Sequence, residues 1–270
     1  MTKRVQIALA FLLVVLAGVI AWQVLRERQP VYQGKRLSVW LVQYGTNHWS
    51  AGRNGELDRQ AEAAIQHIGT NAIPLYLKIM TTGESPLKLK LLALVPKRWL
   101  ARFHLRSVSN YRHLGAYGLI ALGADAKPSI PTLIALLNDK NPDVRYVAVF
   151  ALRSLGRVAG DALPSLIKCL KDPDFRVQSD AILGLGEIHQ EPERVIPILV
   201  KLLDEPQNPQ HSVIIRGNAI WSLLHFGAQA KPAVPRLLRL LDDAHEGIRY
   251  NATNALKAID PDATAKAGVK

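Results

Sequence analysis

Residues 144–156 read VRYVAVFALRSLG, and this stretch decides the fold. Its apolar residues recur at a period of 3.6, so they fall on one face of a helix; they are Val144, Ala148, Ala151, Leu152 and Leu155. The small alanines permit another helix to approach closely. Gly156 ends the stretch, and glycine accepts the left-handed conformation that stops a helix. The sequence therefore predicts an amphipathic helix that packs against other helices.

The same pattern recurs along the chain, each time ending at a marker residue. The markers are Gly69, Gly123, Gly156, His189, Gly227 and Asp260, at spacings of 54, 33, 33, 38 and 33 residues. Eight residues after four of them stands a proline that opens a second apolar run, namely Pro131, Pro164, Pro197 and Pro235. Proline is tolerated in a first helical turn. Each unit is therefore predicted to be a pair of helices, and because one pair cannot bury its own apolar stripe, the units must stack into a solenoid.

These units resemble HEAT repeats, in particular the HEAT-like repeats of the phycobilisome lyase type. The best matches are residues 144–156 and IRYNATNALKAI at 248–259. An arginine recurs eleven residues before the marker, at Arg112, Arg145, Arg216 and Arg249, whereas one unit has Gln178. The stretch YQGKRLSVWLVQYG at 32–45, followed by GTNAIP, resembles the opening of a group of bacterial membrane-anchored HEAT-repeat proteins. The resemblance implies an all-α solenoid of about five units, and it implies no particular chemistry.

A membrane anchor is predicted near the start of the sequence. Residues 5–25 contain no charge, and 21 residues at about 1.5 Å each span the roughly 30 Å of hydrocarbon in a bilayer. The alternative is a cleaved signal peptide, but the apolar stretch is longer than usual and no small-x-small cleavage site follows it. The predicted organisation is a basic tail at 1–4, the anchor at 5–25, a juxtamembrane segment at 26–56, the solenoid at 57–260 and a tail at 261–270.

The orientation of this anchor stays open, because basic residues flank both of its ends. A positive-inside count would put the body in the cytoplasm. A short basic tail before an exported domain is common in bacteria and favours the other side. We expect a single-pass protein of a bacterial inner membrane and favour the extracytoplasmic side for its body.

A basic insert at 83–113 interrupts the repeat and explains the spacing of 54 residues. It carries seven Lys and Arg against Glu84, whereas residues 114–270 have a net charge of only +1. After Pro96, an amphipathic basic helix is predicted from Arg98, Trp99, Arg102 and Arg106. Such a face is either solvated, packed on the repeats, or bound to anionic lipid or an acidic protein. We do not expect nucleic acid as the partner, because no recognised binding motif accompanies the charges.

Catalytic motifs are not found in the sequence. The eight histidines form no HxxxH or HExxH pair, and there is no glycine-rich phosphate loop and no GxSxG turn. Cys169 shares a helical face with Leu166 and Leu170, which is typical of a core residue rather than a nucleophile. We therefore expect no cofactor, no metal, no small-molecule substrate and no enzymatic activity.

An enzyme of the lyase or hydroxylase type is the alternative that the resemblance implies. The deoxyhypusine hydroxylases resemble this chain in fold and bind iron through repeated His-Glu doublets. Here one such doublet occurs, His245-Glu246, in a predicted turn. A single doublet cannot supply that site.

A partner-binding ridge is predicted on the second helix of each unit. The position six residues before the marker faces away from the core positions, and it holds Tyr117, Phe150, Leu183, Trp221 and Asn254. Four of these five are large and apolar, and contiguous exposed apolar surface marks interaction sites. Rim contacts are predicted from Tyr146, Arg153 and His225. The alternative is that curvature packs these side chains against the neighbouring second helices. We predict a scaffold that binds another protein, not identified by the sequence, through its concave helical surface.

Overall fold

The computed structural model describes residues 29–47, 55–82, 108–204, 211–266 and 268. A short antiparallel pair, β1 (Val31–Tyr32) and β2 (Lys35–Arg36), precedes the helices. The helices are α2 (Leu37–Asn47), α3 (Gly55–Ile68), α4 (Ile73–Thr81), α7 (Val108–Leu122), α8 (Ile130–Leu136), α9 (Pro142–Leu155), α10 (Leu163–Cys169), α11 (Phe175–Ile188), α12 (Pro192–Leu202), α13 (Ser212–His225), α14 (Val234–Arg239), α15 (Glu246–Ile259) and α16 (Pro261–Lys266). Short 3₁₀ turns join many of them, such as η2 (Gly123–Ser129), η3 (Gly156–Ala162) and η4 (Gly227–Ala233).

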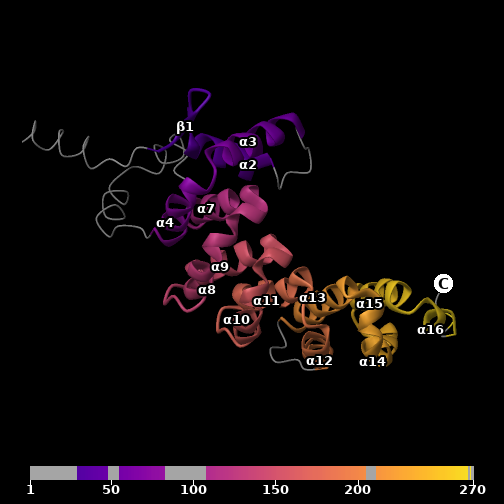
Figure 1. Ribbon diagram of the computed structural model, residues 1–270. Helices are drawn as coiled ribbons and strands as arrows, with labels where there is room; N and C mark the ends of the chain where they lie inside the picture. Colours follow the sequence, from indigo (N-terminus) through magenta and orange to yellow (C-terminus); the bar gives the residue numbers. More distant parts are fainter. Residues whose placement is uncertain (1–28, 48–54, 83–107, 205–210, 267, 269–270) are drawn as a thin grey trace, which may run out of the picture.

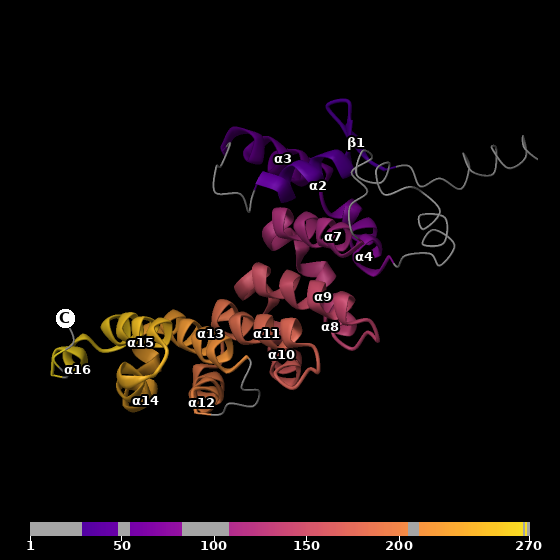
Figure 2. The same cartoon turned by 180° about the vertical axis from the view of Figure 1, so that it is seen from behind.

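The predicted helical solenoid is confirmed. In the described ranges, six helical hairpins follow one another: α2/α3, α4/α7, α8/α9, α10/α11, α12/α13 and α14/α15. The array curves, with α8, α10, α12 and α14 along its outer side and α9, α11, α13 and α15 along its inner side (Figures 1 and 2). The second helices of successive units therefore form the concave face.

The marker residues end the second helices as predicted. Gly123, Gly156 and Gly227 have φ of 58°, 54° and 51°, the left-handed region that glycine accepts without a Cβ penalty. His189, the non-glycine cap of α11, also has a positive φ of 53° and lies in the left-handed helical region. One predicted proline differs: Pro197 lies inside α12, because that helix already begins at Pro192.

The structure also changes three of the predicted boundaries. The packed body begins before residue 57, since α2 lies against α3 and buries Leu37, Trp40 and Leu41. The last residues of the predicted insert belong to α7, which starts at Val108, so the insert lies between the two helices of the second hairpin. Residues 261–266 form α16, which contacts α15, instead of a frayed tail.

Small residues occupy one buried position on each second helix. The position eight residues before the marker is fully buried in five units and holds Ala61, Ala148, Ala181, Ala219 and Ala252. The remaining unit has Gly115 there, and a Cβ added to it would lie 2.3 Å from the carbonyl oxygen of Tyr76 in α4. The backbones of α4 and α7 are therefore closer than even alanine permits.

This close approach predicts that Gly115→Ala destabilises the protein. We expect a loss of about 1–3 kcal/mol in the free energy of unfolding, the usual cost of overpacking, measured by urea unfolding. Gly55→Ala is the matched control, because an added Cβ there meets nothing within 4 Å. Equal stability of the two variants would contradict the close approach.

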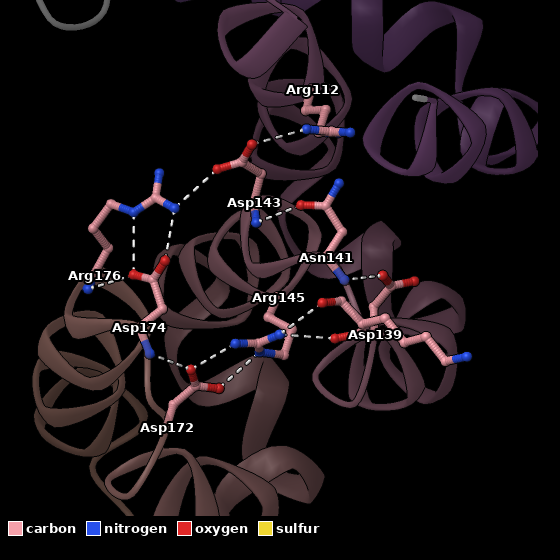
Figure 3. Close-up of polar contacts among 9 residues, drawn as sticks. Arg112, Asp139, Asn141, Asp143, Arg145, Asp172, Asp174 and Arg176 are labelled. Carbon is pink, nitrogen blue, oxygen red and sulfur yellow. Dashed lines mark hydrogen bonds and ion pairs between the residues drawn. The ribbon is translucent and has the colours of Figure 1, made fainter. Parts of the chain in front are cut away.

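Ion pairs join the turn of one unit to the turn of the next (Figure 3). Arg145 donates through Nε and Nη2 to both carboxylate oxygens of Asp172, each at 2.8 Å, and through Nη1 to the carbonyl oxygen of Asp139 at 2.9 Å. The Asp172 side chain is only 8% exposed. One guanidinium therefore holds its own turn and the following turn together, with the bidentate geometry that makes arginine–carboxylate pairs strong.

The arginine eleven residues before the marker has this role in other units too. Arg112 donates to Asp143 at 3.2 Å, and Arg216 pairs with Asp243. Where the pattern has Gln178, its amide donates to the carbonyl oxygen of Leu170 at 2.6 Å, within its own unit. The repeated arginine is thus explained by stacking and not by partner binding.

We expect Arg145→Gln to lower the free energy of unfolding by about 3 kcal/mol, because it leaves the buried Asp172 carboxylate without its partner. Arg176→Gln is the comparison, since Arg176 pairs with Asp143 and Asp174 but its side chain is 44% exposed. An exposed pair contributes about 1 kcal/mol or less. Urea unfolding of both variants checks this order, and a larger loss for Arg176→Gln would reverse it.

Candidate functional site: the concave face

The concave face is built from residues one helical turn apart on the second helices. Positions ten, six and three residues before each marker share one helix face, because they are separated by four and three residues. The predicted ridge is the middle row, from Tyr117 on α7 to Asn254 on α15. The structure divides this face into a closed part over α7 and α9 and an open part over α11 and α13.

The closed part is an aromatic cluster of His113, Tyr117, Tyr146 and Phe150. Ring centroids of Tyr117 and Phe150 are 6.1 Å apart, and His113 lies 5.5 Å from Phe150 and 5.6 Å from Tyr146. Burial raises the pKa of both tyrosine hydroxyls. Phe150 is only 7% exposed, so it is not the exposed side chain that its position predicted. The curvature of the array places the His113 and Tyr117 rings of α7 against Phe150.

The open part is a groove of about 520 Å³ that crosses α9, α11, α13 and the start of α15. Three of the predicted partner-binding residues, Arg153, Leu183 and Trp221, line it. The other lining residues were not predicted; among them are Ile214, Gly217 and Asn251. Trp221 and Ile214 are 40% and 46% exposed, which leaves large apolar surface in contact with water.

The groove opens at the units whose residue ten positions before the marker has a small side chain or none. That row holds His113, Tyr146 and Tyr250 in three units, but Ser179 and Gly217 in the two units between them. Without a side chain at Gly217, nothing on α13 covers the space beside Trp221 one turn later. This change from ring to small residue was the sequence signal that could have located the groove.

Trp221 is supported by His225, the rim residue on the next turn of α13. The Nδ1–H of His225 donates to the carbonyl oxygen of Trp221 at 2.9 Å, and the two rings lie 3.8 Å apart. The indole is thereby held in place while it remains exposed, which is typical of a preformed contact residue.

Arg153 is held on the other side of the groove. Its Nη1 donates to Oδ1 of Asp180 at 2.9 Å, and its guanidinium lies 5.9 Å from the Phe150 ring. Its stem crosses α11 at Gly184, where an added Cβ would lie 3.6 Å from the Arg153 Cβ. Burial raises the pKa of the Asp180 carboxyl, against the opposing charges of Arg153 and His113. The second carboxylate oxygen, Oδ2, is buried and has no hydrogen-bond partner among the described residues.

Cys169 and His245 are the two other residues considered for chemistry in the sequence. Burial raises the pKa of the Cys169 thiol to about 11, which disfavours the nucleophilic thiolate at neutral pH. His245 is the N-cap of α15, where its Nδ1 accepts from the Gly247 N–H at 3.2 Å. Within the part of the chain that the structure describes, no three His, Cys, Asp or Glu side chains are grouped to hold a metal ion.

Two predicted membrane features lie outside the described residues. These are the anchor at 5–25 and the basic helix with Arg98, Trp99, Arg102 and Arg106. In the described part, residues Tyr111–Leu136 are long and apolar enough to cross a membrane. A positive φ at Gly123 divides that stretch into α7, η2 and α8, which pack within the array. The stretch is therefore weak evidence for a membrane-spanning helix.

The comparison with protein families agrees with this architecture. Residues 130–214 match the family model of HEAT repeats. This part of the chain is therefore similar to HEAT repeats. No curated protein matches the sequence. An engineered protein of known structure is 18% identical over 83% of this chain and 96% of its own, with a TM-score of 0.49. The CpcE–CpcF complex of phycocyanin lyase from Nostoc sp. PCC7120 is 19% identical over 89% of this chain and 84% of that chain, with a TM-score of 0.46. Neither likeness shows what this protein binds.

The two halves of the concave face predict different responses to truncation. Phe150→Ala should cost about 3–5 kcal/mol in folding, because it empties a buried ring site. Trp221→Ala should cost much less in folding, because the indole is 40% exposed, yet it should weaken partner binding by about 2 kcal/mol or more. Thermal melting and partner binding of both variants distinguish the two roles. A large loss of melting temperature in Trp221→Ala would show that Trp221 is a core residue.

Proposed function

We propose that this protein is a membrane-anchored HEAT-repeat scaffold that binds another protein through the open part of its concave face. The observation that carries the proposal is the groove in which Trp221 and Ile214 keep large exposed apolar surfaces. Tryptophan is among the side chains that contribute most to protein–protein binding. A solenoid of stacked hairpins supplies the extended concave surface that such binding uses.

Polar side chains around the groove support the same function. Arg153, Asn218 and Asn251 lie among the apolar residues that line it. Protein interfaces combine an apolar centre with polar groups that fix the partner's orientation. The proposal includes no catalytic activity, because the described part of the groove brings together no nucleophile with an activating base.

The membrane part of the proposal rests on residues 5–25. Their uncharged length suits a spanning helix, and a helix of that kind would keep the concave face close to the bilayer. The basic insert would then meet anionic lipid or an acidic protein, an attraction that weakens as salt rises. We favour the extracytoplasmic side for the body.

Site-specific photo-crosslinking in cells tests the binding surface. A benzoylphenylalanine placed at Ile214 or Trp221 is expected to capture one discrete protein, identified by mass spectrometry and confirmed by the reverse capture. The same probe at Lys168, an exposed residue of α10 on the outer side, is the control. No specific adduct from the concave positions, or the same adduct from Lys168, would reject the proposed surface.

Membrane fractionation tests the anchor independently. We expect the full-length chain to stay in the membrane pellet after carbonate extraction, because an uncharged helix of 21 residues is buried in hydrocarbon. N-terminal sequencing should find residues 5–25 still attached. A mature chain that begins near residue 22, or release by carbonate, would identify a cleaved signal peptide instead.

A further inference from the structure

We infer that the groove binds a polypeptide segment in which a carboxylate side chain lies a few residues from a large apolar side chain. This inference rests on the proposed function and specifies the chemistry of the partner. The carboxylate is expected at Arg153, and the apolar side chain at the surface formed by Leu183, Ile214 and Trp221.

The charge of the groove favours an anionic partner. Among its described lining residues, Arg153 is the one side chain with a permanent charge, and no carboxylate lines the groove. Asp180, which pairs with Arg153, is 91% buried and lies outside the lining. The lining therefore offers a cationic partner no carboxylate, whereas it offers an anionic partner a guanidinium and no like charge.

Arg153 has N–H donors left over with which it could bind a second acceptor. A guanidinium has five N–H donors, and one of them is committed to Asp180 at 2.9 Å. Among the described residues, no further acceptor is in hydrogen-bond contact with its side chain. Because Asp180 and Gly184 already fix its position, binding of a carboxylate orders little more of this side chain.

One of the two amides that line the groove, Asn218, is already used within the protein. The Nδ2 of Asn218 donates to Oγ of Ser179 at 2.8 Å and to the Ser179 carbonyl oxygen at 3.3 Å. Asn251 and His245 also line the groove as polar groups, and Arg153 is the lining residue that carries a permanent charge for a carboxylate. The apolar surface on α11 and α13 completes the site, since Gly217 leaves space beside the Trp221 indole.

The spacing of the two partner side chains follows from the helix stacking. Arg153 lies on α9 and Trp221 on α13, with α11 between them. Packed helices are about 8–10 Å apart, so the two residues are separated by at most about 16–20 Å. An extended segment rises about 3.3 Å per residue and covers that distance in about six residues. The acidic and apolar residues should therefore lie within about six positions of each other.

Selection from a random dodecapeptide library displayed on phage tests the chemistry. The target is the full-length chain in detergent micelles. We expect enrichment of sequences in which Asp or Glu lies within about six residues of Leu, Ile, Phe or Trp. Enrichment of basic sequences, of purely apolar sequences or of no sequence would overturn the inference.

Fluorescence anisotropy with one selected, labelled peptide then tests the role of Arg153. Arg153→Gln should weaken binding at least tenfold, whereas Arg157→Gln, an exposed arginine outside the groove with the same charge change, should alter it less than twofold. Because Arg153→Gln leaves a buried Asp180 unpaired, Arg153→Gln/Asp180→Asn is measured as well and should bind equally weakly. Replacing the peptide's acidic residue by its amide should give the same loss, and no further loss in the Arg153 variants.

The outcomes separate this inference from the proposed function. If Trp221→Ala abolishes peptide binding while Arg153→Gln binds like Arg157→Gln, the concave scaffold stands and the acidic specificity is wrong. If neither Trp221→Ala nor Arg153→Gln changes binding, the peptide lies elsewhere and both proposals fail.

Discussion

The stacking of the second helices is the constraint on which the rest of this structure depends. A single helical hairpin cannot bury both of its apolar faces, so each unit must be covered by the next. The buried alanines eight residues before the markers keep the second helices small on their packed side. The closest contacts are made by glycines: a Cβ at Gly186 of α11 would collide with the backbone of Ser222 in α13, and a Cβ at Gly115 of α7 with the backbone of α4. The first helices α8, α10, α12 and α14 lie on the outer side, and the second helices lie on the inner side of the curve (Figure 1).

The turn-to-turn ion pairs act within this constraint. Stacking brings the turn of one unit beside the next, and there Arg145 and Arg216 neutralise Asp172 and Asp243. Burial alone would raise the pKa of the Asp243 carboxyl, but the hydrogen bond from the His245 N–H and the Arg216 pair outweigh it, so its pKa is lowered. The arginine recurs in the units where it joins two turns, whereas Gln178 in its place bonds within its own unit. Recurrence here identifies structural residues, and the surface becomes distinct where the repeat changes.

The concave face shows such a change. Over α7 and α9 the rings of His113, Tyr117 and Phe150 fill the inner surface, and there is no room for a partner between them. Over α11 and α13 the residues in the corresponding row are Ser179 and Gly217, and the surface opens into the groove that exposes Trp221. An array of similar helical hairpins thus acquires one distinct groove where two residues of the row are small.

The sequence by itself determined the period, the paired helices, the turn residues and the rows of each helix that face inward. These features depend on neighbours within one or two helical turns, and glycine conformation and helix periodicity report them directly. Only the tertiary structure decided that Phe150 is buried and Trp221 exposed, although both occupy the same position in their units. It also decided that residues 37–47 belong to the packed body and that Pro192 opens α12. The exposure of a side chain on the concave face depends on residues one repeat away in the sequence, and the pattern within a single unit does not contain them.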